Sequence, residues 1–173
     1  MKTKLLCHYG PPKDKFSLGV ISLALVTSGD ILVGAGDGTV AILRGDNYKK
    51  VKSASVEKGV TSLALRGQGH QFFAGTEKSE IFKFNYAEFS KELVTACHSG
   101  SVLDIAFPYA YSDVFATCCK NDIRVWNAHT SKELLRIVLP NITCHAVDFM
   151  IDGKSIISGN SNFINQQFCS ADY

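Results

Sequence analysis

The sequence lacks the features that mark membrane, secreted and nucleic-acid-binding proteins. No apolar run approaches the roughly 20 residues that cross a bilayer, and the start MKTKLLCHYG has almost no hydrophobic stretch for a secretory signal. The 18 Lys and Arg residues nearly balance 16 Asp and Glu residues and are interspersed with them, so no basic stripe is available to follow phosphates. These absences argue against all three classes.

The sequence also lacks the paired cysteine spacings of a disulfide or zinc framework. Its six cysteines are expected to act as small buried hydrophobic residues in a reducing compartment. Three dipeptides do contain zinc-ligand types: Cys97-His98, Cys118-Cys119 and Cys144-His145. They fall on different predicted strands and loops, so no metal site and no cofactor is predicted. His145 is expected on the bulky face of its strand, either as a core residue or near an end of the sheet.

What the sequence does contain is a repeat with a period near forty. Four predicted first strands can be superimposed: VISLAL (20–25), VTSLAL (60–65), VLDIAF (102–107) and CHAVDF (144–149). Four second strands follow them: ILVGA (31–35), FFAGT (72–76), VFATC (114–118) and IISGN (156–160). A third echo, KELV (91–94) against KELL (132–135), favours strands over a helical interpretation of residues 85–96. This period on short strands is typical of a β-propeller.

Each first strand alternates large and small residues, as in Ile21, Leu23 and Leu25 against Ser22 and Ala24. Because successive side chains on a strand point to opposite faces, each strand presents one bulky face and one tight face. We expect both faces to be buried between stacked sheets. The glycine-rich run at residues 34–38 is followed by the strand TVAIL rather than a helix, which argues against a dinucleotide site.

The third unit carries further motif residues. His98 precedes a first strand, and DIRVWN (122–127) ends a third strand with Trp126, which together resemble a WD repeat. Asp37 occupies the turn that supplies the structural aspartate in the first unit. Departures from the pattern are Lys78 and Lys120 in the aspartate's place, and Leu43, Phe84 and Phe168 in the tryptophan's place. The hydrogen-bonded set of the repeat is therefore predicted to be incomplete in every unit.

Longer segments resemble one family in particular. GPPKDKFSLGV (10–20), GHQFFAGTEKSEIF (69–82), DIRVWN and ITCHAVDFMIDGKSIIS (142–158) are similar to cilia- and flagella-associated WD-repeat proteins with two tandem propellers. The resemblance covers roughly residues 9–159. It implies a non-enzymatic structural protein of motile cilia that lies inside axonemal doublet microtubules and touches tubulin and other inner proteins. It implies no catalytic residues, no small-molecule substrate and no membrane or nucleic-acid partner.

The predicted fold is all-β: a partial WD-repeat propeller with about three complete four-stranded blades and an incomplete fourth. The segments are residues 1–15 (outer strand of a preceding blade and linker), 16–57, 58–99, 100–140, and 141–173. After Ser158 the sequence departs from the repeat, and the chain is expected to be a fragment or a product with altered ends. With too few blades to close a ring, the isolated chain is predicted to be marginally stable or to associate.

The predicted structural positions of the repeat are His98, Asp37, Asp104 and Trp126, and the predicted partner-facing residues are Lys49, Lys50 and Lys52. The leading hypothesis is a cytoplasmic scaffold of the ciliary axoneme that supports beating. An alternative is a cytosolic adaptor for a ligase or signalling complex. A nucleotide-dependent enzyme using the glycine-rich turn is a third possibility.

Overall fold

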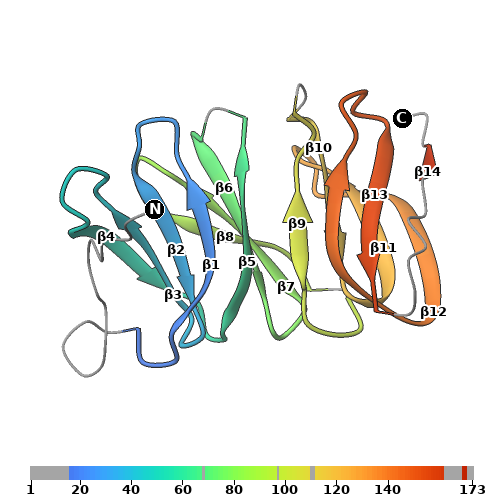
Figure 1. Ribbon diagram of the computed structural model, residues 1–173, viewed down its shortest axis with the longest axis horizontal. Helices are drawn as coiled ribbons and strands as arrows, with labels where there is room; N and C mark the ends of the chain where they lie inside the picture. Colours follow the sequence, from blue (N-terminus) through green and yellow to red (C-terminus); the bar gives the residue numbers. More distant parts are fainter. Residues whose placement is uncertain (1–15, 68, 97, 110–111, 162–168, 171–173) are drawn as a thin grey trace, which may run out of the picture.

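The computed structural model describes residues 16–67, 69–96, 98–109, 112–161 and 169–170. Throughout these residues the regular structure is strand, and none of it is helix. Three antiparallel sheets stand side by side along the molecule (Figure 1). This arrangement confirms the predicted all-β fold and the partial propeller. The described part of the chain has no helix that is long and apolar enough to cross a membrane.

The first two sheets are four-stranded meanders in which each strand pairs with the next. The first contains β1 (Val20–Leu25), β2 (Ile31–Ala35), β3 (Thr39–Leu43) and β4 (Lys50–Ser55). The second contains β5 (Val60–Arg66), β6 (Gln71–Thr76), β7 (Glu80–Asn85) and β8 (Lys91–Ala96). Strand β8 confirms that KELV is extended, as its repeat partner predicted.

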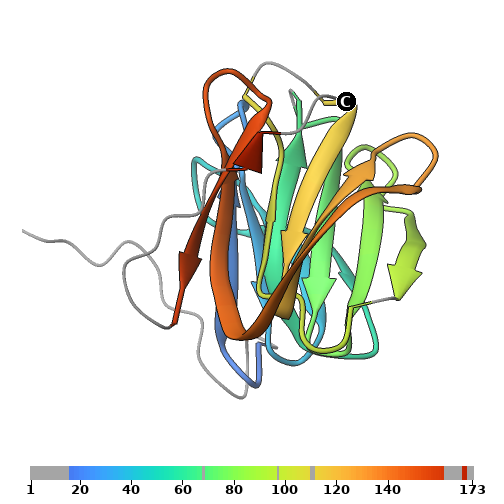
Figure 2. The ribbon, with the colours of Figure 1, turned by 90° about the vertical axis from the view of Figure 1, so that its right-hand side faces the viewer.

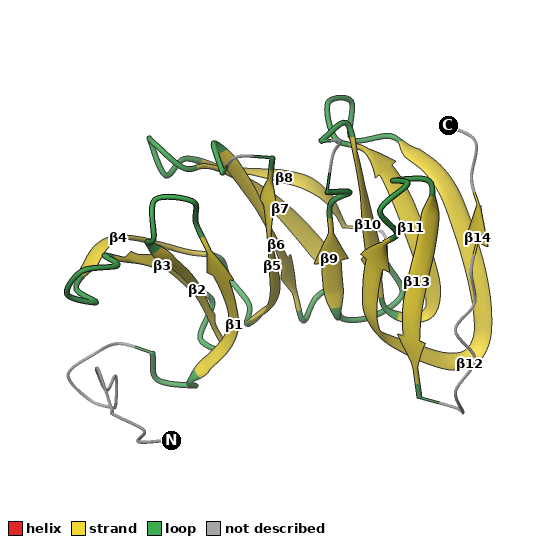
Figure 3. Cartoon of the chain, turned by 45° about the horizontal axis from the view of Figure 1, so that its top comes forward, coloured by secondary structure: helices red, strands yellow, loops and turns green. Residues whose placement is uncertain are grey.

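The third sheet has six strands because one long strand joins two units. Its members are β9 (Asp104–Ala106), β10 (Val114–Cys118), β11 (Lys120–Asn127), β12 (Glu133–Phe149), β13 (Ser155–Asn160) and β14 (Cys169–Ser170). The first half of β12 pairs with β11, and its second half pairs with β13 (Figures 1 and 3). The predicted boundary between residues 140 and 141 falls inside β12, where Asn141 has a φ of 60°.

The core lies between neighbouring units. Leu32 of β2 packs with Val60 and Leu63 of β5 in one cluster. Phe73 of β6 packs with Ile105 of β9 in the next. The last cluster joins β9, β10 and β11 to β12 and β13. Figure 2, viewed along the array, shows how the sheets overlap. In the second, third and fourth units, a large side chain of the first strand thus packs against the unit before it: Leu63, Ile105 and Val147.

Two sequence expectations are wrong. The bulky face of β1 is not buried, because Ile21, Leu23 and Leu25 are exposed and no described sheet lies against them. His145 is exposed and so is not a core residue, because the register shift between Cys144 and Ala146 takes it out of the regular alternation. The predicted strand over residues 2–8, and the residues Cys97 and Phe168, lie outside the described residues.

A buried histidine–aspartate network

The candidate site is a hydrogen-bonded network at the centre of the third unit. His98 comes from the loop before β9, Thr117 from β10, and Asp122 and Trp126 from β11, and all four are buried. His98 Nδ1 lies 2.7 Å from Asp122 Oδ1, and His98 Nε2 lies 2.6 Å from Thr117 Oγ1. Trp126 Nε1 donates to the same Thr117 oxygen at 2.8 Å. The network therefore links a loop and two strands.

The directions of these hydrogen bonds form one consistent chain. An ionised carboxylate can only accept, so the proton of neutral His98 sits on Nδ1 and is donated to Asp122. Nε2 of His98 then accepts from the Thr117 hydroxyl, whose oxygen accepts from the Trp126 indole. Every polar group on this path has a partner, which is the condition under which a buried polar network rigidifies a core.

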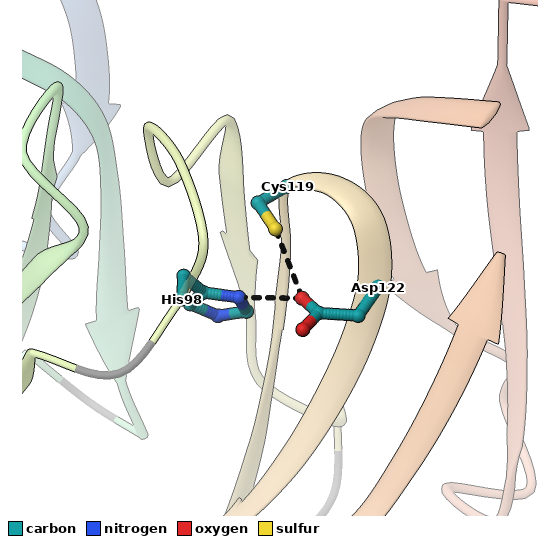
Figure 4. A group of neighbouring side chains, drawn as sticks. All are labelled: His98, Cys119 and Asp122. Carbon is teal, nitrogen blue, oxygen red and sulfur yellow. Dashed lines mark hydrogen bonds and ion pairs between the residues drawn. The ribbon is translucent and has the colours of Figure 1, made fainter. Parts of the chain in front are cut away.

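Asp122 is the central member of the network. Its Oδ1 also accepts from the Cys119 thiol at 2.9 Å (Figure 4), and its Oδ2 accepts from two nitrogens of Arg124 at 2.8 and 3.0 Å. Arg124 is itself buried and donates to Glu133 at 3.0 Å. A two-nitrogen contact of this kind is among the stronger charge-assisted hydrogen bonds.

The network overturns the expectation that every unit is incomplete. Sequence alignment placed Lys120 in the aspartate's position, yet Lys120 is exposed and Asp122 makes the contacts. The turn between the second and third strands also differs in length. Four residues separate the paired Cys118 and Ile123, whereas five separate the equivalent pair Gly34 and Val40 in the first sheet. The carboxylate is supplied from the start of β11, two residues after the aligned position.

Burial sets the protonation states in the network. Removal from water lowers the pKa of His98, and this outweighs the attraction of Asp122, so the imidazole is neutral. Burial opposes ionisation of Asp122, but the hydrogen bonds from Arg124, Cys119 and His98 outweigh it and lower the pKa of that carboxyl. Burial, together with the bond to Asp122, raises the pKa of Cys119 to about 11, so this thiol is protonated and unreactive at neutral pH.

His98, Cys119 and Asp122 are also the one group of possible metal ligands found among the described residues, with ligand atoms within 4.8 Å of one another (Figure 4). Their environment does not suit a cation. The Arg124 guanidinium already neutralises Asp122, and both nitrogens of His98 are engaged in hydrogen bonds. The donor set is therefore arranged to hold the fold together rather than to bind a metal.

The other two predicted structural aspartates, Asp37 and Asp104, accept hydrogen bonds that tie neighbouring segments together. Asp37 accepts from Ser17 N at 3.0 Å and from Thr39 N at 2.9 Å, which ties the turn after β2 to the segment before β1. Partial burial opposes its ionisation, but these bonds together lower the pKa of Asp37. Asp104 in the third unit accepts from Val147 N in the fourth unit at 3.0 Å. Burial raises the pKa of the Asp104 carboxyl.

The known proteins that resemble this chain share one name. No protein-family model matches it. Proteins named cilia- and flagella-associated protein 52 are 53% identical in Bos taurus and 49% in Homo sapiens over 157 residues, and 40% in Chlamydomonas reinhardtii over 161 residues. The chain is homologous to these WD-repeat proteins of cilia and flagella. Each match covers 91% of the chain, which spans only about a quarter of the relatives' length.

The lysines predicted to face a partner are partly engaged by contacts within the chain. Lys50 lies over the Phe16 ring, 5.0 Å from its centroid, and the Lys52 ammonium donates to the carbonyl of Ala87. Lys49 is exposed beside Asn47, whose side-chain oxygen accepts from the Lys49 backbone N–H. Of the three, Lys49 is thus the most accessible to a partner.

A rim cavity of about 470 Å³ lies between the second and third sheets and was missed by the sequence analysis. Arg66 at its edge donates to Ser112 O and Gln71 Oε1, both at 2.8 Å, and its Nη2 lies 2.9 Å from His129 Nε2. His129 also contacts Asp113 at 2.9 Å. Because these residues come from strand ends and turns far apart in the sequence, no local pattern could have grouped them.

Proposed function

We propose that this chain is a non-enzymatic structural scaffold of motile cilia and flagella. In this proposal it binds inside axonemal doublet microtubules, contacts tubulin and other inner proteins, and supports ciliary beating. The observation that carries the proposal is the 40–53% identity to cilia- and flagella-associated proteins over 91% of the chain. The chain spans a quarter of those relatives, so the role is that of a portion of the propeller array.

The architecture supports recognition by a rigid surface. Adjacent sheets interlock through large side chains, and the fully bonded network around His98 fixes the third unit. Turns at the rim therefore keep fixed relative positions, which is how repeat arrays present extended binding surfaces. The chemical groups near the network also favour a structural role, because His98 and Cys119 are buried and already hydrogen-bonded.

The test is to express the tagged full chain in ciliated cells and to fractionate their axonemes. We expect the tag on the axoneme, resistant to detergent, with tubulin among cross-linked neighbours. Lys49→Glu should weaken this retention if the basic turn meets an acidic surface, and Lys154→Glu, on a turn of the fourth unit, is the matched control. A diffuse cytosolic signal with ligase or signalling subunits co-purifying would instead support the adaptor alternative and refute the ciliary scaffold.

A further inference from the structure

The rim cavity lies between the second and third units, at the end of the array that carries the turn between β5 and β6 and the loop between β9 and β10 (Figure 1). The corresponding gap between the first and second units is crossed by Tyr86, whose hydroxyl donates to Asp30 at 3.1 Å. In the third unit Ala128 takes the place of Tyr86, since each lies two residues after the aromatic residue in the tryptophan's place. An alanine methyl is too short to cross the gap. Gln71, the counterpart of Asp30, therefore lines a cavity of about 470 Å³.

Arg66 is fixed in the wall of this cavity and keeps unused donors. Its Nε donates to Ser112 O and its Nη1 donates to Gln71 Oε1, both at 2.8 Å. His129 Nε2 lies 2.9 Å from Asp113 Oδ1 and donates to it, because an ionised carboxylate only accepts. That nitrogen then has no lone pair for Arg66, whose Nη2 keeps the longer contact to His129 Nδ1, at 3.3 Å. A guanidinium has five N–H groups, so one on each terminal nitrogen has no partner among the described residues.

The other polar side chains of the cavity also present donors. The amide oxygen of Gln71 accepts from Arg66. The amide oxygen of Asn85 accepts from two backbone N–H groups of the following turn, at 2.9 and 3.0 Å. These contacts fix the orientation of both amides and leave their NH₂ groups for a ligand. The exposed His70 also lines the cavity and can donate an imidazole N–H. A cavity lined in this way suits a ligand that is rich in hydrogen-bond acceptors.

The charges in the cavity favour a carboxylate over a phosphate. Among the residues that line it, Arg66 is the one permanent cation and Asp113 is the one carboxylate. A carboxylate ligand accepts two parallel hydrogen bonds from a guanidinium and has a single negative charge. A phosphate monoester has a charge of about −1.5 to −2 at neutral pH, so Asp113 would repel it more strongly.

The cavity is open to solvent, which favours a segment of a partner protein over a free small molecule. The side chains of Asp113 and His129 are 74% and 60% exposed, whereas small-molecule sites bury most of the ligand's surface. We propose that the rim cavity binds an acidic side chain, glutamate or aspartate, that projects from a partner protein. Its carboxylate accepts from both terminal nitrogens of Arg66, with the Gln71 and Asn85 amides as further donors. This chemistry is the same for any partner that presents such a segment, so the inference does not rest on the ciliary function.

The test is an NMR titration of the full, isotopically labelled chain with a short peptide of alternating glutamate and glycine, capped at both ends. We expect the backbone signals of Gly67, Gln71 and Asp113 to shift, with a dissociation constant of about 1 mM or tighter. The matching peptide of glutamine and glycine should leave these signals unchanged. Excess glutarate should displace the acidic peptide, whereas inorganic phosphate at the same concentration should not.

Gln71→Glu is the decisive variant. The new carboxylate still accepts from Arg66, so the fold is kept, but it occupies the guanidinium and repels the peptide. We expect the dissociation constant of the acidic peptide to rise about tenfold or more. Arg66→Gln removes the cation and should weaken binding at least as much. Lys78→Gln is the matched control, because Lys78 is exposed beyond the other end of β6 and the substitution makes the same change in net charge.

Circular dichroism shows whether each variant is folded, and Gln71→Glu keeps the proposal testable should Arg66→Gln fail to fold. The proposal is overturned if the wild-type chain does not bind the acidic peptide or binds the glutamine peptide equally well. It is also overturned if phosphate displaces the peptide as readily as glutarate does, or if Gln71→Glu and Lys78→Gln weaken binding alike. Retention on axonemes is a separate measurement, so failure of this inference and failure of the ciliary scaffold are distinguishable.

Discussion

At the scale of single residues, one carboxylate organises the third unit. Asp122 accepts from His98, Cys119 and Arg124, and its removal would leave a buried guanidinium and a buried imidazole without their shared acceptor. Breaking a buried ion pair by deleting one partner costs far more than the pair contributes as a whole. The network is thus a point where a single substitution should have a large effect on the free energy of unfolding.

We predict that Asp122→Ala lowers the free energy of unfolding by about 3 kcal/mol or more. Asp122→Asn should cost less, about 1–3 kcal/mol, because the amide oxygen still accepts one hydrogen bond. Lys120→Ala is the matched control, since Lys120 is exposed, and it should stay within about 0.5 kcal/mol of wild type. Urea denaturation followed by tryptophan fluorescence measures all three. Equal losses for Lys120→Ala and Asp122→Ala would show that Asp122 does not hold the network.

The protonation state of His98 predicts a pH dependence of stability. Its pKa is lowered in the folded chain, so below the unfolded value, about 6.5, the unfolded state binds a proton that the folded state does not. The free energy of unfolding should therefore fall between pH 7 and pH 5, by at most about 1.4 kcal/mol per pH unit from this residue. Asp104, whose pKa is raised, stabilises the folded chain as the pH falls. Its contribution is the same in wild type and in His98→Gln, so it cancels when the two proteins are compared.

The measurement is the urea midpoint of wild type and His98→Gln at several pH values, with exposed His129→Gln as the control. The difference between wild type and His98→Gln should shrink as the pH falls, because only wild type carries the buried neutral imidazole. His129→Gln lies outside the network and controls for the loss of a histidine side chain. If the wild-type and His98→Gln profiles were parallel instead, the histidine would not be held neutral by the fold.

At the scale of elements, the sequence period predicts the strands well and the turns less well. VISLAL and ILVGA coincide with β1 and β2 because alternation and glycine-containing turns are local signals. The complete network in the third unit escaped prediction because its turn has a different length and the carboxylate comes from the strand, at Asp122, instead of from the aligned turn position. The exposure of β1 also escaped, since alternation shows that a face is apolar but not whether a neighbour covers it.

The close approach of neighbouring sheets predicts different outcomes for equivalent glycines. Gly75→Ala should destabilise the chain by about 1–3 kcal/mol, because its Cβ would meet Val102 Cγ1 and Ser62 Oγ at 2.6 Å. Gly34→Ala should behave alike, since its Cβ would meet Val60 Cγ1 at the same distance. Gly159→Ala, at the equivalent position on the open face, should be close to neutral. Thermal unfolding of the three variants tests this, and a large loss for Gly159→Ala would argue against an open face.

At the scale of the whole molecule, the described sheets form a linear array in which each unit packs on its neighbours. Strand β5 contacts β1 and β2 on one side and β9 on the other. The second and third units therefore pack against described units on both sides, while the first and fourth each pack against only one. In an array of this kind stability is close to a sum over units and their interfaces, so the ends are the weakest parts.

This arrangement predicts a gradient of amide hydrogen exchange along the chain. At low concentration, β6 in the middle sheet should exchange slowest, because Phe72 and Phe73 are fully buried on its two faces. Strands β1 and β13 should exchange faster, since each lies in a unit that packs against only one other described unit. The exchange is measured by mass spectrometry of peptides. Uniform exchange across the three sheets would contradict the prediction that the units at the ends of the array are the least stable.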